Sequence, residues 1–187
     1  MKMKNATQEQ LIQMLRMQDE LNVKYNGTDW RKGVKLGMAK FALLDEVSEM
    51  AREIRVTWAW WKKNPGPMNL DLAREEFIDI LHFAMLIALY RYDVNVLTRT
   101  ITDDQDICAD MSGPVGDPHN YFVKALTRFF RSVDEENICG VIAGLMNLID
   151  VGSLLLSLEP GDVFHIYTVK NEKNHVRVDT GQTVRPA

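Results

Sequence analysis

The chain has 187 residues, of which 46% are hydrophobic and 26% charged, and its formal net charge is −4. These values are close to the average for soluble globular domains and exclude wholesale disorder and a fibrous protein. The negative charge excludes a broadly basic surface, so we expect neither nucleic acid nor a membrane as a partner. Two cysteines, Cys108 and Cys139, are too few for a disulfide framework, and they predict reduced thiols in a cytoplasmic protein.

Helix-spaced apolar residues dominate the chain and strand patterns are scarce, so we predict one all-α domain over 1–187, a bundle of six main helices. Thr7 and Gln10 predict a capping box that opens the first helix. The Asn-Pro-Gly-Pro run at 64–67 is a strong stop for the second helix, and Asp71 can cap the third. The six predicted ranges are 8–25, 36–62, 71–92, 117–133, 135–158 and 160–178.

The second half of the chain contains a turn-rich segment and an apolar one. Residues 93–116 are acidic and rich in turn formers, which predicts a variable loop with at most a short helical turn. Asp117 followed by Pro118 predicts a helix start with a first-turn proline. The apolar stretch 141–158 carries Asn147 and Asp150 and is too short to be a confident membrane span, so we expect a soluble protein.

Carboxylates occur on the second and third predicted helices next to positions expected in the core. Glu46 and Glu49 lie one turn apart, close enough to share a cation. Asp79 stands in the nearly uninterrupted apolar run 77–89, with Glu76 one turn before it. A buried ionised carboxylate needs a partner. The expected buried stripe of the second helix runs beside the two glutamates and consists of Leu44, Val47, Ala51, Ile54 and Trp58.

Four carboxylates on two facing helices repel one another unless cations lie between them. Hard oxygen ligands without cysteine favour Mg²⁺ or Mn²⁺. The alternative is a set of surface acids that pair with lysine and arginine side chains. The spacing predicts a cation site, and the apolar surroundings of Asp79 favour it over the alternative.

The last predicted helix carries cationic and amide side chains along one face. Lys170, Asn171, Asn174 and Arg177 follow one another at helical spacing. Such a set suits a phosphate chain, although a basic last turn also complements the helix dipole. Beside a carboxylate metal site, the phosphate interpretation gains weight.

Two further features suit an aromatic ligand. Gln18 and Asn22 continue the apolar stripe of the first helix, where their amides either read the edge of a base or pair with the backbone. Three tryptophans, at positions 58, 60 and 61, precede Lys62. One of their rings can stack on a base while Lys62 reaches a phosphate, or the rings can simply pack at a helix end.

These blocks together resemble the dimeric, all-α dUTPases, including the phage dCTPase–dUTPase branch, within the all-α nucleoside triphosphate pyrophosphohydrolases. The two carboxylate pairs, Glu46-x-x-Glu49 and Glu76-x-x-Asp79, have 26 residues between them. Five blocks match in order, one of which contains the second carboxylate pair: LRMQDELN (15–22), NGTDWRKG (26–33), TWAWWK (57–62), EEFIDILHF (75–83) and KNEKNHVRVDTG (170–181).

The resemblance implies a homodimer that hydrolyses a pyrimidine deoxynucleoside triphosphate to the monophosphate and pyrophosphate, with dUTP the first expectation and dCTP the second. It implies two or three Mg²⁺ ions, replaceable by Mn²⁺, at Glu46, Glu49, Glu76 and Asp79. Glu46 would orient and deprotonate the attacking water beside Glu49, as catalytic residues. The implied substrate contacts are Gln18, Asn22, Trp61, Lys62, His82, Lys170, Asn171, Asn174 and Arg177.

Three positions depart from the motifs of the family that the chain resembles. Ala59 stands where the tryptophan motif usually has lysine, and Val178 and Gln182 stand where the last motif has glutamine and tyrosine. We expect the metal chemistry to survive these changes, whereas substrate affinity or base preference can differ.

Two other classes of protein remain as alternatives. A di-iron or di-manganese carboxylate bundle is suggested by Asp79-x-x-His82 and Asp162-x-x-His165, which have the acid–histidine spacing of such sites. A non-catalytic helical interaction protein would use the same acids in salt bridges. The first alternative leaves the cationic last helix unexplained, and the second leaves the intact set of four carboxylates unexplained.

Overall fold

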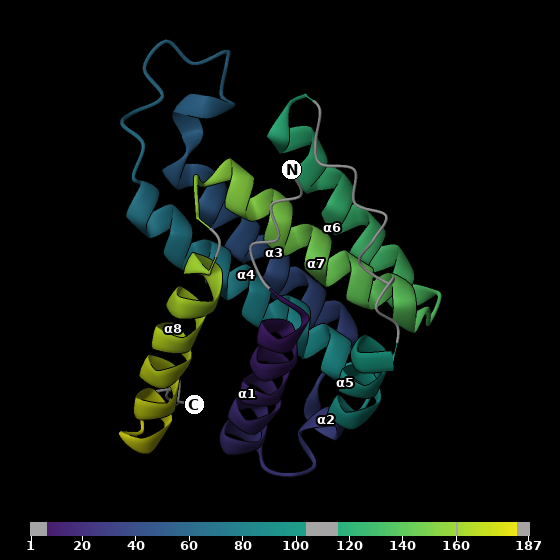
Figure 1. Ribbon diagram of the computed structural model, residues 1–187. Helices are drawn as coiled ribbons and strands as arrows, with labels where there is room; N and C mark the ends of the chain where they lie inside the picture. Colours follow the sequence, from purple (N-terminus) through teal and green to yellow (C-terminus); the bar gives the residue numbers. More distant parts are fainter. Residues whose placement is uncertain (1–6, 104–115, 160, 183–187) are drawn as a thin grey trace.

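The structure is a computed structural model that describes residues 7–103, 116–159 and 161–182 (Figure 1). Within these ranges all regular structure is helical, which confirms the all-α prediction. The elements are α1 (Gln8–Asn26), α2 (Trp30–Gly33), α3 (Leu36–Glu53), the 3₁₀ turn η1 (Arg55–Thr57), α4 (Leu70–Arg91), α5 (Val94–Asp103), α6 (Pro118–Asp134), α7 (Ile138–Leu155) and α8 (Asp162–Asp179).

Two helix starts form as their sequences predict. Thr7 Oγ1 accepts a hydrogen bond from the Gln10 amide at 3.2 Å, and the Thr7 amide donates to Gln10 Oε1 at 2.9 Å, so the capping box opens α1. Asp117 Oδ1 accepts from the His119 amide at 3.0 Å, with Pro118 in the first turn of α6. Both devices satisfy amide groups that have no partner inside the helix.

The predicted end of the second helix is wrong, because α3 ends at Glu53 rather than near residue 62. Two side chains take carbonyl groups at this end of the helix. Trp58 Nε1 donates to Ala51 O at 2.8 Å, and Thr57 Oγ1 donates to Ile54 O at 2.8 Å. Such local side-chain bonds compete with continuation of a helix. The tryptophan motif therefore lies in a loop and not on a helix.

Other predicted boundaries also need correction. Asn69, not Asp71, caps α4, through a 3.2 Å bond from the Leu72 amide to its side chain. Part of the expected loop 93–116 is the helix α5, whose apolar face is buried, and residues 104–115, including Cys108, lie outside the described residues. Periodicity was too short there to distinguish a helix from a turn.

The last two helices begin later than predicted. Asn137 caps α7, which runs over Ile138–Leu155 instead of 135–158, because its side chain accepts from the Gly140 amide at 3.0 Å. Gly161, with φ of 94°, precedes α8, and the expected start at Pro160 lies outside the described residues. Cys139, in the first turn of α7, is an exposed free thiol.

Figure 1 shows two antiparallel helix pairs, α3 with α4 and α6 with α7, with α4 and α7 packed against each other. On the other side of α4, α1 lies between α8 and α5. Gly152 permits the close approach of α7 to α4, because a β-carbon there would overlap the ring of Phe77. This arrangement buries α4 almost all round, with α3, α1, α7 and α8 packed against it.

The apolar helix α7 belongs to the core. By length and composition α7 could cross a membrane, as could α4 and α5 if they formed one broken span, but 56% of α7 is buried inside the protein. The core helix of a soluble protein has the same composition, so this is weak evidence for a membrane span.

The buried stripe of α3 differs from the predicted one by about one residue. Of the predicted stripe, Ile54 is buried just beyond α3 and Val47 packs partly buried on the core, but Leu44 is 43% exposed. The buried residues within α3 are instead Ala39, Leu43 and Met50. In helical register the gap between Leu43 and Met50 is filled by Glu46. Glu46 therefore lies on the face of α3 that turns toward α4 rather than on its flank.

Candidate active site

Three glutamates from two helices come together at the α3–α4 pair. Glu46 and Glu49 of α3 and Glu76 of α4 each offer one carboxylate oxygen, and these oxygens lie within 4.8 Å of one another. We call this set the glutamate cluster. Among residues 7–103, 116–159 and 161–182 it is the one group of three or more acidic, histidine or cysteine side chains with this geometry. An all-oxygen set suits a hard divalent cation such as Mg²⁺.

The glutamate cluster is short of positive charge. Burial, followed by the charges of Asp79, Glu76 and Glu49, raises the pKa of Glu46 from 4.5 to about 7. Burial and the charge of Asp79 likewise raise the pKa of Glu76. Among the described residues, the one ion pair to the cluster is that of Arg52, which lies 2.6 Å from the Glu49 carboxylate, while the charge of Lys170 partly opposes the rise at Glu76. A bound cation would relieve this repulsion.

The fourth predicted ligand, Asp79, has a cationic partner from α8. Lys170 Nζ lies 2.8 Å from Asp79 Oδ2, and the two side chains are only 12% and 22% exposed. Burial raises the pKa of Asp79, and the hydrogen bond and charge of Lys170 oppose that rise. The structure thus groups three of the four predicted carboxylates and pairs the fourth with a predicted phosphate ligand.

Beside the glutamate cluster lies a buried chain of neutral hydrogen bonds. Gln18 Nε2 donates to Asn22 Oδ1 at 2.8 Å, and Gln18 Oε1 lies 2.6 Å from His82 Nδ1. The Tyr167 hydroxyl donates to the same Gln18 oxygen at 3.0 Å, and its ring stacks on His82 with centroids 4.5 Å apart. We call Gln18, Asn22, His82 and Tyr167 the amide–histidine network. It joins α1, α4 and α8.

The hydrogen bonds fix the protonation of His82. The Gln18 carbonyl oxygen can only accept, so His82 Nδ1 carries the hydrogen. Burial and the charge of Lys170 lower the pKa of His82 from 6.5 to about 3, so the ring is neutral and Nε2 has a free lone pair.

Three buried polar atoms around this network have no partner among the described residues. They are the acceptor His82 Nε2 and the donors Asn22 Nδ2 and Asn171 Nδ2. Asn171 follows Lys170 on α8 and is 2% exposed. Because an unsatisfied buried polar group is costly, three of them around one network indicate a polar ligand.

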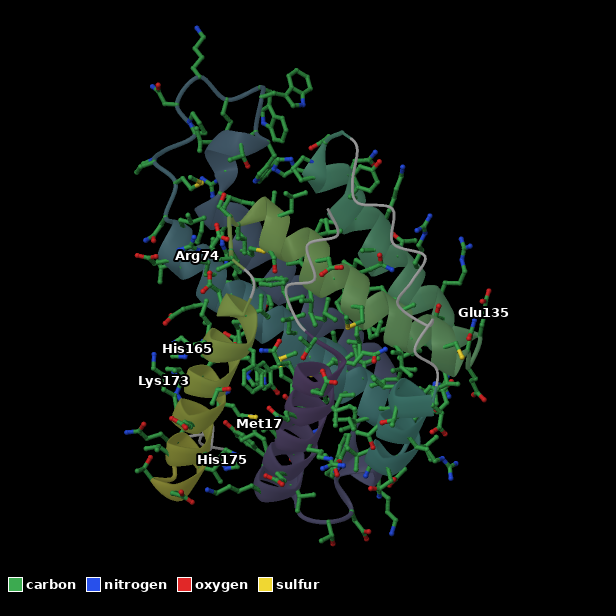
Figure 2. All side chains as sticks on the ribbon, in the orientation of Figure 1. Met17, Arg74, Glu135, His165, Lys173 and His175 are labelled. Atoms are coloured by element: carbon green, nitrogen blue, oxygen red, sulfur yellow. The ribbon has the colours of Figure 1, made fainter. Side chains whose placement is uncertain are left out.

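The glutamate cluster and the amide–histidine network meet on α4, and the Asp79–Lys170 pair links that helix to α8. Asp79 and His82 lie one turn apart on α4, and Lys170 and Asn171 are consecutive on α8. Figure 2 shows Lys173 on the side of α8 that points away from α1. Lys170 instead turns inward to Asp79, so one helix presents different cations inside and outside.

Other predicted substrate residues lie apart from this centre. Trp61 is 57% exposed in the loop after η1, where its ring meets Trp58 and Trp60 at 5.5 and 5.8 Å. In the described ranges, no hydrogen bond, ion pair or ring contact links Trp61 or Lys62 to the glutamate cluster. Arg177 is exposed on α8 and donates to Asn174 Oδ1 at 3.2 Å.

The positions that depart from the motifs have clear locations. Ala59 is 3% exposed, so the loop buries the position where a lysine was expected. Val178 is half-buried in the last turn of α8, and Gln182 is exposed beyond it. None of the three belongs to the glutamate cluster or to the amide–histidine network.

The two acid–histidine pairs of the carboxylate-bundle alternative do not form one centre. His82 is engaged by Gln18, and Asp79 by Lys170. His165 is exposed on α8 (Figure 2), and Asp162 Oδ2 accepts from the Glu159 amide at 2.7 Å. The glutamate cluster includes no histidine, unlike the usual di-iron site.

Two functional features escaped the sequence analysis. Tyr167 was not predicted, although it lies one turn before Asn171 on the same face of α8. The Asp79–Lys170 pair was not predicted either, because residues on different helices carry no mutual spacing signal. A buried tyrosine one turn from two site residues was the available signal.

The comparison with protein families agrees with this geometry. No curated protein matches the chain. A family model described as dUTPase matches residues 10–181, a range that contains every residue of the glutamate cluster and of the amide–histidine network. With a match over nearly its whole length, the chain belongs to the dimeric all-α dUTPase family, whose general activity is dUTP hydrolysis.

Proposed function

We propose that this protein hydrolyses dUTP to dUMP and pyrophosphate with Mg²⁺ at the glutamate cluster and the base at the amide–histidine network. The observation that carries the proposal is that a cluster short of positive charge and a buried network short of hydrogen bonds lie on the same helix, α4, less than two turns apart. A triphosphate with its metal ions would supply positive charge to the glutamate cluster, and a pyrimidine would supply hydrogen-bond partners to the amide–histidine network.

Glu46, Glu49 and Glu76 would hold the Mg²⁺ ions, two or three in number, with Asp79 as the fourth carboxylate. Mn²⁺, which takes the same ligands, would substitute. When bound, the ions supply positive charge to the phosphate chain and activate water. Each glutamate contributes an oxygen that has few competing donors, which supports the assignment.

Glu46 is the best candidate for the general base. Its pKa, raised to about 7, lies near neutral pH, where a carboxylate can both exist in its basic form and accept a proton from water. Glu49 lies within 4.8 Å and would keep that water oriented. The proton leaves the attacking water for the Glu46 carboxylate, and pyrophosphate leaves as the other product.

The cations of α8 would contact the triphosphate. Lys170 already lies at the carboxylates, so it would contact the phosphates beside Asp79. Arg177 and Asn174 continue the same helix, and we propose them for a phosphate and for the sugar or base. Trp61 and Lys62 belong to an exposed loop, and we propose that they meet the pyrimidine and a phosphate when substrate is bound.

The network favours uracil over cytosine. Uracil presents the acceptor O4 beside the donor N3–H, whereas cytosine presents a donor amine beside the acceptor N3. Within the described part of the chain, Asn22 Nδ2 is a donor without a partner and His82 Nε2 an acceptor without one, which is the complement of uracil. Asn171 Nδ2 adds a donor for O2. We therefore propose dUTP as the main substrate and dCTP as a poorer one.

We also propose that the protein acts as a homodimer in the cytoplasm. Met38 and Phe41 of α3 are 67% and 77% exposed, and Leu44 adds to the same apolar surface. A second copy would cover this surface. Sedimentation analysis should show a dimer, and Phe41→Lys should yield monomers. A monomeric parent protein would contradict the assignment.

The decisive experiment is pyrophosphate release from a panel of deoxynucleoside triphosphates with Mg²⁺. We expect turnover of dUTP, weaker turnover of dCTP, and loss of both in Glu49→Gln and Asp79→Asn. The matched control is Glu135→Gln, since Figure 2 places Glu135 far from α8, at the other end of the α6–α7 pair. Absence of turnover on every nucleotide, or full activity in both site variants, would refute the proposal.

A further inference from the structure

We propose that Tyr167 is a positioning residue that holds the amide–histidine network in the arrangement that reads uracil. The proposal rests on the proposed function, since it concerns the base of the same substrate. It starts from the direction of the hydrogen bonds, not from the identity of the residues that meet the base.

Hydrogen bonds link Asn22, Gln18 and His82 into one relay with a direction. His82 Nδ1 donates to Gln18 Oε1, and Gln18 Nε2 donates to Asn22 Oδ1. The opposite direction is chemically possible. If both amides turn over and His82 moves its hydrogen from Nδ1 to Nε2, then Asn22 donates to Gln18 and Gln18 donates to His82. Both directions make the same two bonds and leave the same total charge.

The two directions present opposite free ends to a base. In the observed direction, Asn22 ends in an unpartnered donor and His82 in an unpartnered acceptor, among the described residues. In the reversed direction, Asn22 would end in the acceptor Oδ1 and His82 in the donor Nε2–H. The first pair complements O4 and N3–H of uracil, and the second complements the amine and N3 of cytosine.

Tyr167 favours one of the two directions. Its hydroxyl donates to Gln18 Oε1 at 3.0 Å, an interaction that exists only while the Gln18 oxygen faces α8. In the reversed direction that position holds an amide NH₂ group, which cannot accept. The hydroxyl hydrogen would then turn to Met14 O, which lies 3.4 Å away, at the limit for a hydrogen bond.

The surroundings of Tyr167 strengthen its preference for the observed direction of the hydrogen bonds. The residue is fully buried, so its hydroxyl has no access to water as another acceptor. Burial also raises the pKa of the phenol, so the hydroxyl keeps its hydrogen. The ring stacks on His82, which holds the hydroxyl and the imidazole in a fixed relation.

The test is Tyr167→Phe, which removes one oxygen and keeps the stacked ring. We expect the ratio of kcat/KM for dUTP to that for dCTP to fall by about 3- to 10-fold, the value of one neutral hydrogen bond. The matched control is Tyr92→Phe, because Tyr92 is at the end of α4 and its buried hydroxyl has no hydrogen bond to the described residues. The control should keep the parent ratio.

A second measurement does not depend on turnover. Nitrogen-15 NMR distinguishes the two ring nitrogens of His82, whose signals are identified by their loss in His82→Gln. The hydrogen should be on Nδ1 in the parent protein, and Tyr167→Phe should move part of the population to Nε2. A hydrogen on Nε2 in the parent, or no change in either the ratio or the tautomer in Tyr167→Phe, would overturn the proposal.

The two proposals fail in different ways. If no nucleotide is hydrolysed, the proposed function is refuted, and the NMR experiment still decides the direction of the relay. If dUTP is hydrolysed and Tyr167→Phe lowers kcat/KM for dUTP and dCTP equally with an unchanged tautomer, the enzyme assignment stands. Tyr167 is then merely part of the core.

Discussion

The glutamate cluster and the amide–histidine network are neighbours with opposite physical character. The first consists of half-buried acids, among which burial and neighbouring charges raise the pKa of Glu46 and of Glu76, and the second consists of neutral groups that bind one another away from water. Each is incomplete in its own way. The cluster is short of positive charge, whereas two buried atoms of the network, Asn22 Nδ2 and His82 Nε2, have no hydrogen-bond partner among the described residues.

This contrast separates two properties of the proposed enzyme. The affinity for a divalent cation should depend on charge and pH, because it rests on carboxylates that must be ionised. The choice of base should depend on the direction of neutral hydrogen bonds, which pH barely alters while His82 stays neutral. The four predictions below test that separation.

Glu76→Gln should have the largest effect, and it should impair the glutamate cluster without altering the amide–histidine network. We expect kcat with dUTP to drop by about 10²–10³, the cost of losing one preorganised charged group. The affinity for dUMP should not change, because the network is intact. Steady-state kinetics and calorimetry measure the two effects. A matching loss of dUMP affinity would show that the two regions are not separable.

Lys170→Met should destabilise the protein, because it leaves Asp79 buried without its cation. The side chains are not fully buried, so we expect a loss of about 2–3 kcal/mol in the free energy of unfolding, below the range for a wholly buried pair. Mg²⁺ should restore part of the lost stability, since a cation near Asp79 replaces the charge of the Lys170 ammonium group. Urea unfolding with EDTA and with Mg²⁺ measures both.

The control for that change is Lys173→Met, three residues further on α8. Lys173 has a 57% exposed side chain and lies 3.6 Å from Glu75, so we expect a change below about 0.5 kcal/mol. Equal losses in the two variants would mean that burial of the Asp79–Lys170 pair is not what matters.

Gly152→Ala should disturb both regions through α4. The added β-carbon would overlap the ring of Phe77, the residue after Glu76, and we expect a loss of about 1–3 kcal/mol. Gly37→Ala, on α3, is the control. A β-carbon at this position meets no atom within 4 Å, so the change should stabilise the protein by about 0.5–1 kcal/mol. Thermal unfolding compares them, and an unchanged Gly152→Ala protein would contradict the packing described here.

The smallest effects should come from pH, with opposite signs in the two regions. The pKa of Glu46 rises from 4.5 to about 7 on folding, so its contribution favours the folded state below pH 4.5 and is lost as pH rises to about 7. The pKa of His82 falls from 6.5 to about 3, so its contribution is present above pH 6.5 and is lost as pH falls toward 3.

Melting temperatures of the metal-free protein across pH 4–8 check these signs. In the parent protein, Glu46 should make the stability decrease as pH rises, and Glu46→Gln should remove that decrease. His82 should make the stability increase as pH rises, and His82→Gln should remove that increase. Excess Mg²⁺ should abolish the Glu46 effect only, because the cation favours the ionised carboxylates. The same sign in both variants would contradict the assignment of charge to one region and neutrality to the other.

The sequence predicted the helical class and the three acids that meet in the glutamate cluster, because both leave local signals. Spacing along a helix placed Glu46 beside Glu49, and a lone acid in an apolar run marked Asp79. Helix ends were predicted where a side chain caps the next amides, as at Thr7 and Asp117. These are interactions between residues only a few positions apart.

What the sequence did not predict depends on contacts between distant residues. The end of α3 is an exception, because Thr57 and Trp58 set it by bonding to carbonyl groups only three and seven residues before them. The buried face of α3, shifted from the predicted one, is chosen by its packing on α4, which moves Glu46 toward that helix. Pairing of Asp79 with Lys170 joins residues on α4 and α8. No periodicity within one helix records such a pairing.

The order of the helices along the chain also has a consequence for synthesis on the ribosome. The glutamates of α3 and α4 are translated and can meet long before α8 is made. Until α8 emerges, Asp79 has no lysine and Gln18 has no tyrosine hydroxyl. A nascent or prematurely terminated chain would therefore carry its acids without their counter-charge, and the last helix to leave the ribosome would complete both halves of the site at once.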